Sequence, residues 1–216
     1  MHKSITNLNL IKEDLKSKVQ DYDNLKIIAV SKTFSIDQIL PLIKYGHLHY
    51  GENKVQEAIN KWSDVKLEYS DIKLHLIGKL QTNKVKLSVK LFDYIHSLDS
   101  EKLAKKIADE ELKQNKKIKI FIQVNIGDEN QKSGITKKQL DDFYSYCREL
   151  SLDIIGLMCI PPLDINPIFF FQEMQLLTKK LKLPELSMGM SSDYLEAAKN
   201  SATYLRVGSS IFGKRN

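Results

Sequence analysis

Short apolar runs alternate with longer segments of helical spacing along almost the whole chain. Before the first run, apolar residues recur every three or four positions and predict a helix, at Ile5, Leu8, Ile11, Leu15 and Val19. The runs themselves predict strands over residues 25–30, 47–50, 73–77, 94–98, 118–125, 154–158, 185–188 and 204–207. Strands that alternate with helices in this way form a parallel sheet.

Helix-start and helix-end signals separate the predicted strands. Residues 35–38 and 136–139 fit the capping box, Ser4 is placed to cap the first helix, and Gly46 is placed to end the second. About eight strand–helix units in a chain of 216 residues favour a closed barrel over an open doubly wound sheet. We therefore predict an α/β protein, a single (β/α)8 TIM barrel over residues 1–216 with an extra N-terminal helix.

Lys32 is the first candidate for chemistry, because the functional site of such a barrel lies at the carboxyl ends of the strands. It follows the first predicted strand directly. Burial at a strand end disfavours the charged ammonium form of a lysine. The same cost makes Lys32 a candidate amine nucleophile toward an aldehyde, as in Schiff-base lysines. A snorkelling surface lysine is the alternative interpretation.

Two clusters of serine and glycine, at residues 187–192 and 206–210, stand where a strand meets a helix start. Free backbone N–H groups there attract an anion, and glycine lets a phosphate approach the backbone. The loops after the seventh and eighth strands are also a frequent phosphate site of these barrels. Ordinary helix caps are the alternative. A phosphate site beside a Schiff-base lysine indicates a phosphorylated aldehyde, for which pyridoxal phosphate (PLP) is the obvious cofactor.

Charge and cysteine content argue against other classes of function. The net charge is +6, but lysines alternate with acids as on solvated helix faces, so we expect no nucleic acid partner. Cys147 and Cys159 have neither metal-ligand spacing nor the density of a disulfide scaffold. His47 and His49 share a face of the predicted second strand without a third ligand nearby, so we expect no metal site. No secretory signal or membrane span is recognisable, and the expected location is the cytoplasm.

Seven motifs run in order over nearly the whole chain, at residues 29–33, 50–57, 75–84, 124–134, 156–158, 186–191 and 206–213. Together they resemble the pyridoxal phosphate homeostasis protein family, whose fold is the barrel of the alanine racemase N-terminal domain. The resemblance places eight residues at the cofactor: Lys32, Asn53, Ser187, Met188, Ser191, Arg206, Gly208 and Ser209. It implies that Lys32 forms the Schiff base and that Arg206 faces the pyridine nitrogen. The phosphate would lie at Ser191, Gly208 and Ser209.

The resemblance leaves a choice between an enzyme and a carrier. Racemases with this barrel need a second acid/base, a tyrosine from an additional domain of a partner subunit, and the predicted barrel already uses the whole chain. An arginine at the ring nitrogen donates hydrogen bonds without losing its proton, so the ring is a poor electron sink. We therefore expect a protein of intracellular PLP homeostasis that holds PLP without strong catalysis.

Three alternatives stay open at this point: a PLP-dependent racemase-like enzyme, a class I aldolase that uses Lys32, and a pure interaction module. The expected partners are PLP and apo forms of PLP enzymes, and the expected oligomeric state is a monomer. The polar stretch 126–134 is expected to form an exposed loop over the site.

Overall fold

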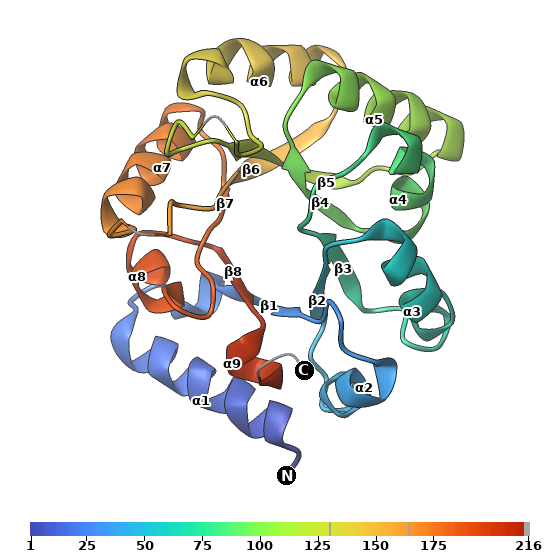
Figure 1. The fold of residues 1–216 in the computed structure, drawn as a ribbon, viewed down its shortest axis with the longest axis vertical. Coiled ribbons are helices and arrows are strands. Elements are labelled where there is room, and N and C mark those ends of the chain that lie inside the picture. Colours follow the sequence, from blue (N-terminus) through green and yellow to red (C-terminus); the bar gives the residue numbers. More distant parts are fainter. Residues whose placement is uncertain (130, 164, 214–216) are drawn as a thin grey trace.

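The computed structural model describes residues 1–129, 131–163 and 165–213 and confirms a closed barrel of eight parallel strands (Figure 1). The strands are β1 (Lys26–Val30), β2 (His49–Glu52), β3 (Lys73–Leu76), β4 (Tyr94–Leu98), β5 (Lys119–Val124), β6 (Asp153–Cys159), β7 (Glu185–Ser187) and β8 (Tyr204–Val207). Each strand pairs with the next along the chain. The barrel closes where β8 pairs with β1, for example Ala29 with Val207.

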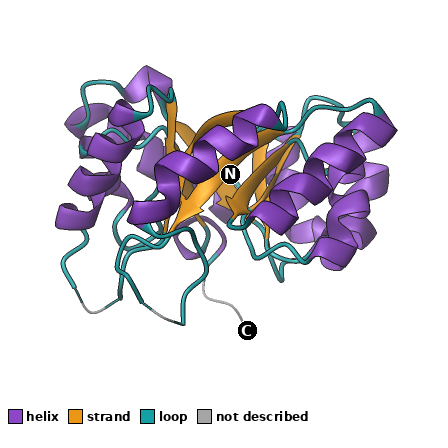
Figure 2. Ribbon diagram, turned by 90° about the horizontal axis from the view of Figure 1, so that it is seen from above, coloured by secondary structure: helices purple, strands orange, loops and turns teal. Residues whose placement is uncertain are grey.

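Helices surround the barrel on its outside (Figures 1 and 2). The α-helices are α1 (Lys3–Lys18), α2 (Ile36–Lys44), α3 (Val55–Glu68), α4 (Val85–Leu91), α5 (Glu101–Gln114), α6 (Leu140–Glu149), α7 (Ile168–Lys180), α8 (Tyr194–Lys199) and α9 (Ser209–Phe212). Short 3-10 turns are η1 (Tyr22–Asn24), η2 (Thr82–Lys84) and η3 (Lys137–Gln139). Within the described ranges, no helix has the length and apolar character needed to cross a membrane.

The extra N-terminal helix is confirmed and packs outside the barrel, beside α8 and α9 (Figure 1). The Asn7 amide donates to the carbonyl oxygen of Ile211 at 2.9 Å, which ties α1 to the end of the chain. The predicted cap was wrong by two residues. His2 is the N-cap and its Nδ1 accepts from the backbone N–H of Ser4 at 3.3 Å, whereas Ser4 lies inside the helix.

The predicted strand boundaries hold to within two residues, and the capping box that begins α2 is present. At the second predicted capping box, residues 136–139, the structure has the 3-10 turn η3 instead, and α6 begins at Leu140. The largest shift is in β2, which begins at His49 and extends to Glu52 instead of starting at His47. His47 and His49 therefore do not share a strand face. The strand predicted from the sequence ends at Tyr50, because a carboxylate such as Glu52 is not expected in a buried strand. In the structure Glu52 is nevertheless buried and belongs to β2.

The core has two layers, because alternate strand residues point in opposite directions. Outward-facing residues pack against the helices, and Trp62 packs against Tyr50 there, with ring centroids 4.9 Å apart. The two cysteines are buried and free. Inward-facing residues fill the barrel around a separate cluster of Ile28, Tyr94, Phe121, Met158 and Tyr204. Figure 2 shows the strand arrows ending on the side where the long loops lie.

Candidate functional site

A cavity of about 350 Å³ lies at the carboxyl ends of the strands and brings together six of the eight candidate residues. These are Lys32, Asn53, Ser191, Arg206, Gly208 and Ser209. They come from the ends of β1, β2 and β8 and from the loop after β7. Five further residues complete the lining, namely Val30, Ile77, Ile160, Met190 and Ser192. Val30, Ile77 and Ile160 carry no signal in the sequence, because they are ordinary aliphatic residues at strand ends, whereas Met190 and Ser192 lie in the serine and glycine cluster at residues 187–192.

Ser187 and Met188 do not line the cavity. Ser187 points into the barrel, where its hydroxyl accepts a hydrogen bond from Arg206 Nη1 at 2.7 Å. Met188 is fully buried in the outer core layer. Because neighbouring strand residues face opposite sides, a motif that spans both cannot place both at one site.

The two loops that carry the serine and glycine clusters, after β7 and β8, meet at Ser191. Its hydroxyl oxygen accepts hydrogen bonds from the backbone N–H groups of Gly208 at 3.2 Å and Ser210 at 3.3 Å. In the described part of the chain, the backbone N–H groups of Ser191, Ser192 and Ser209 have no protein acceptor. Unpaired N–H groups that surround a cavity are suited to bind an anion.

The glycine at position 208 has a packing reason besides the phosphate approach that the sequence suggests. Its φ is −118°, which any residue can adopt. A Cβ built there would lie 3.3 Å from both the Cβ and the carbonyl oxygen of Val30. Gly208 thus allows close packing of β8 on β1. At Gly78, a Cβ would lie 2.3 Å from the carbonyl oxygen of Asn53, so this glycine lets β3 approach the cavity residue Asn53.

The loop that carries Lys32 is held by a buried carboxylate. Glu52 Oε1 accepts hydrogen bonds from the Ser31 hydroxyl at 2.7 Å, Lys61 Nζ at 3.0 Å and Trp62 Nε1 at 3.0 Å. Ser31 directly precedes Lys32. Lys61 also donates to the Ser31 carbonyl oxygen at 2.9 Å. These bonds fix the chain on the amino side of Lys32, whose side chain is half-buried.

Arg206 is a buried cation with neutral partners. Only 5% of the residue is exposed. Its Nη1 donates to Ser187 and its Nη2 donates to the carbonyl oxygen of Cys159 at 2.8 Å. Among the described residues it forms no ion pair with a carboxylate. Burying an unpaired charge is costly, so the cavity beside Arg206 is suited to a ligand group that accepts hydrogen bonds.

Three histidines lie behind Arg206 in the barrel interior. His96 Nδ1 is 2.9 Å from Ser187 Oγ. His96 Nε2 is 2.9 Å from His75 Nδ1, and His75 Nε2 is 2.9 Å from His49 Nδ1. His75 and His96 are fully buried. Burial lowers the pKa of both imidazoles well below the ordinary value, with a further lowering from the charge of Arg206 for His96.

Because of these buried histidines, we predict that the folded protein loses stability in mild acid. Burial also lowers the pKa of His49 to about 4 and that of His47 to about 3. All four rings stay neutral in the folded protein, while the unfolded chain takes up protons below pH ~6.5. Their stabilisation is therefore full above that pH and is lost as the pH falls, by about 1.4 kcal/mol per pH unit for each fully buried ring.

Urea unfolding between pH 7.5 and 5 measures this effect. The expected midpoint falls steadily below pH ~6.5. His96→Gln should make this fall less steep. A midpoint that is flat over this range would contradict the prediction.

The polar loop lies beside the cavity, as expected, although residue 130 is outside the described residues. The Asn125 amide donates to the Glu129 carbonyl oxygen at 2.9 Å and holds the loop's first turn. Gln131, Lys132 and Ser133 line a second hollow of about 360 Å³. It shares Asn53, Ile77 and Ile160 with the main cavity. The loop therefore forms one wall of an extended cleft.

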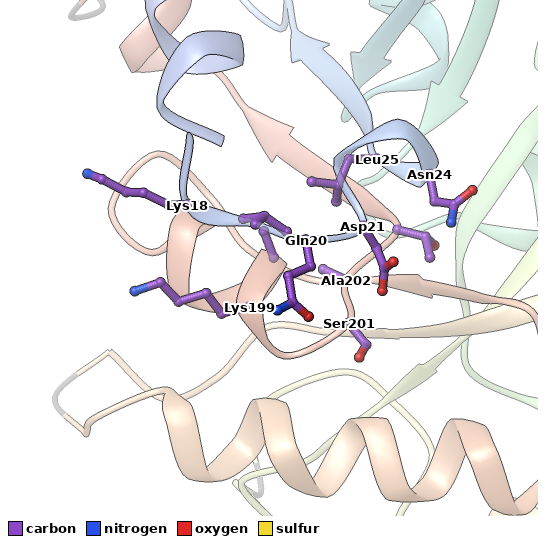
Figure 3. Close-up of a pocket in the computed structure, with 11 residues that line it drawn as sticks. Lys18, Gln20, Asp21, Asn24, Leu25, Lys199, Ser201 and Ala202 are labelled. Atoms are coloured by element: carbon purple, nitrogen blue, oxygen red, sulfur yellow. The ribbon is translucent and has the colours of Figure 1, made fainter. Parts of the chain in front are cut away.

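Another hollow, of about 490 Å³, lies near the amino ends of β1 and β8 (Figure 3). Its lining includes Lys18, Asp21, Lys199 and Ser201. Because it is at the opposite end of these strands from Lys32, it does not belong to the site. Within the described ranges, no group of three or more histidine, cysteine, aspartate or glutamate residues is arranged to hold a metal ion.

Comparisons with known proteins show the family of the chain. Residues 6–216 match the family model "Alanine racemase, N-terminal domain". The pyridoxal phosphate homeostasis protein of Aquifex aeolicus is 37% identical, with 88% of this chain and 87% of that protein covered. The Escherichia coli K12 protein of the same name is 33% identical, with 90% of this chain and 87% of that protein covered.

Solved structures show the same barrel. PipY of Synechococcus elongatus without PLP is 33% identical and has a TM-score of 0.87, with 98% of this chain and 100% of that chain covered. The structure of PipY with PLP bound has a TM-score of 0.83, with 93% of this chain and 97% of that chain covered. An alanine racemase of Clostridium difficile shares the fold at 13% identity and a TM-score of 0.74, and this chain covers 57% of it. The chain therefore belongs to the alanine racemase N-terminal domain family and, within it, to the pyridoxal phosphate homeostasis proteins.

Proposed function

We propose that this protein binds PLP at the cavity and holds it through a covalent bond to Lys32. The observation that carries the proposal is the convergence, on one cavity, of a lysine amine, unpaired backbone N–H groups and a buried arginine without a carboxylate partner. The amine suits an aldehyde, the backbone N–H groups suit a phosphate, and the arginine suits a pyridine nitrogen. The structure of a relative, PipY, contains PLP.

Each cavity residue has a distinct role in this proposal. When bound, the cofactor supplies an aldehyde carbon that can form an imine with an amine. Lys32 provides that amine. The N–H groups near Ser191 and Ser209 bind the phosphate, and Gly208 sets the distance between β8 and β1. Asn53 lines the cavity just after the end of β2.

The protein holds the cofactor without activating it strongly. A guanidinium donates hydrogen bonds and keeps its proton at ordinary pH, so Arg206 stabilises an unprotonated pyridine nitrogen. An unprotonated ring withdraws electrons poorly and gives little help to a carbanion. The similarity to racemases is limited to the fold, at 13% identity. Relatives at 33–37% identity are named as homeostasis proteins.

The PLP-loaded protein is therefore expected to have negligible racemase activity. An ordinary enzyme turns over about ten times per second. Incubation with L-alanine and other amino acids, followed by chiral chromatography, measures the rate directly. Turnover at that rate, dependent on added PLP, would show that the protein is a racemase-like enzyme, and a PLP-free sample is the control.

Substitution of Gly208 tests the position of the phosphate. Gly208→Val should weaken retention of PLP, because the new side chain pushes β8 away from Val30 and moves the loop N–H groups. Ser209→Ala should have a smaller effect, since its backbone N–H remains. Equilibrium dialysis against PLP compares both with the parent. If Gly208→Val binds PLP as tightly as the parent, the phosphate lies elsewhere.

The wider role is homeostasis of PLP inside the cell. We infer that the protein works in the cytoplasm as a monomer and that apo forms of PLP enzymes receive the bound cofactor. A transfer assay tests this inference: the PLP-loaded protein is mixed with an apo-enzyme in the presence of a trap for free PLP. Reactivation no faster than from free PLP would argue against direct delivery.

A further inference from the structure

The hydrogen bonds behind Arg206 use the hydroxyl hydrogen of Ser187 in only one direction. A guanidinium has donors and no acceptor, so Nη1 donates to the Ser187 hydroxyl. Ser187 then has a single hydrogen of its own to donate. Among the described residues, its acceptor within hydrogen-bonding distance is His96 Nδ1, at 2.9 Å. Ser187 therefore donates to His96.

This direction fixes the tautomers of the next two rings. Since His96 Nδ1 accepts, a neutral His96 carries its proton on Nε2 and donates to His75 Nδ1. His75 likewise carries its proton on Nε2 and donates to His49 Nδ1. A second proton on either ring would put two donors face to face. The lowered pKa values of His75 and His96 agree with rings that stay neutral.

The two rings are not needed simply to fill space. His96 stacks on Phe121 and His75 stacks on Tyr94, each with ring centroids 4.2 Å apart. An apolar side chain could fill this layer without the cost of burying polar atoms. The polar atoms of both rings are instead used fully, in one continuous chain that ends at Arg206.

We propose that Ser187, His96 and His75 are positioning residues for the cofactor site: their one-directional hydrogen-bond chain holds the Arg206 guanidinium so that its remaining N–H groups are available to the cavity. A guanidinium has five N–H donors, of which the bonds to Ser187 and Cys159 use two. The inference rests on the proposed function, because the group that Arg206 meets in the cavity is taken to be the pyridine nitrogen of PLP.

The first test needs no cofactor. Nitrogen-15 NMR of the histidine rings at pH 7 should show both His75 and His96 protonated on Nε2 and unprotonated on Nδ1. Ser187→Ala should release His96 from this single tautomer. If the parent protein has its protons on Nδ1, the chain runs the other way and the proposal fails, whether or not PLP binds.

The second test measures the site itself with PLP as the probe. His96→Leu removes both ring nitrogens, and His96→Gln keeps one acceptor and one donor. A hydrogen bond to a charged group typically corresponds to about a tenfold change or more in affinity. His96→Leu should therefore weaken PLP binding by about tenfold and shift the visible absorption band, and His96→Gln should restore part of both.

Phe121→Leu is the matched control, because it removes the stacking partner of His96 but no hydrogen-bonding group. It should lower stability while leaving the band in place. Equal effects of His96→Leu and Phe121→Leu on affinity and band would reduce the histidines to packing and overturn the proposal. Should His96→Leu fail to fold, Ser187→Ala breaks the chain at the next link and gives the same comparison. A parent protein that does not bind PLP would refute the proposed function. The NMR result would still test the direction of the hydrogen-bond chain.

Discussion

Lys32→Ala is expected to abolish both the visible absorption of the PLP-loaded protein and the adduct that borohydride reduction traps on the parent chain. An imine cannot form without the amine. The fold should survive, because the side chain is half-buried and contributes no large apolar contact to the core. Non-covalent binding should persist but weaken, since the phosphate and ring contacts are separate from the covalent bond.

Mass spectrometry of the reduced and digested parent protein makes this result decisive. The adduct should map to the peptide that contains Lys32. Lys79→Ala is a suitable control, because this exposed lysine lines the neighbouring hollow and not the main cavity. An adduct on another lysine, with Lys32 unmodified, would overturn the assignment on which the proposed function depends.

Glu52→Ala is expected to cost about 3–5 kcal/mol of unfolding free energy, the typical effect of breaking a buried ion pair. The carboxylate is fully buried, and the side chain of its partner Lys61 is 9% exposed. The substitution leaves the Lys61 ammonium with less compensation and the Trp62 N–H without its acceptor. It also frees the Ser31 hydroxyl, so the loop that carries Lys32 should hold PLP less tightly.

Chemical denaturation in urea measures the loss. Glu57→Ala is the matched control, because Glu57 pairs with the same Lys61 at 3.1 Å but its side chain is 29% exposed. A partly exposed pair of this kind contributes about 0–1 kcal/mol. If the two variants lose the same stability, the buried carboxylate does not have the role given to it here.

The sequence by itself determined the architecture and most of the cavity. Short apolar runs between segments of helical spacing located all eight strands, because strands that are buried on both faces of a parallel sheet are apolar along most of their length. Once the strands alternate with helices, their carboxyl ends must meet at one end of the barrel. That rule brought Lys32 and Gly208 to the same cavity, where the family resemblance also placed Asn53 and Arg206.

Only the tertiary structure decided which way the side chains near these ends point and what they bond. Ser187 and Met188 are adjacent in one motif, yet one supports Arg206 and the other fills the outer core, because the pleat turns neighbours to opposite faces. His75 and His96 meet Ser187 across strands far apart in sequence. A hydrogen bond requires two atoms about 3 Å apart, and that distance depends on strand register and barrel closure, which no local pattern contains.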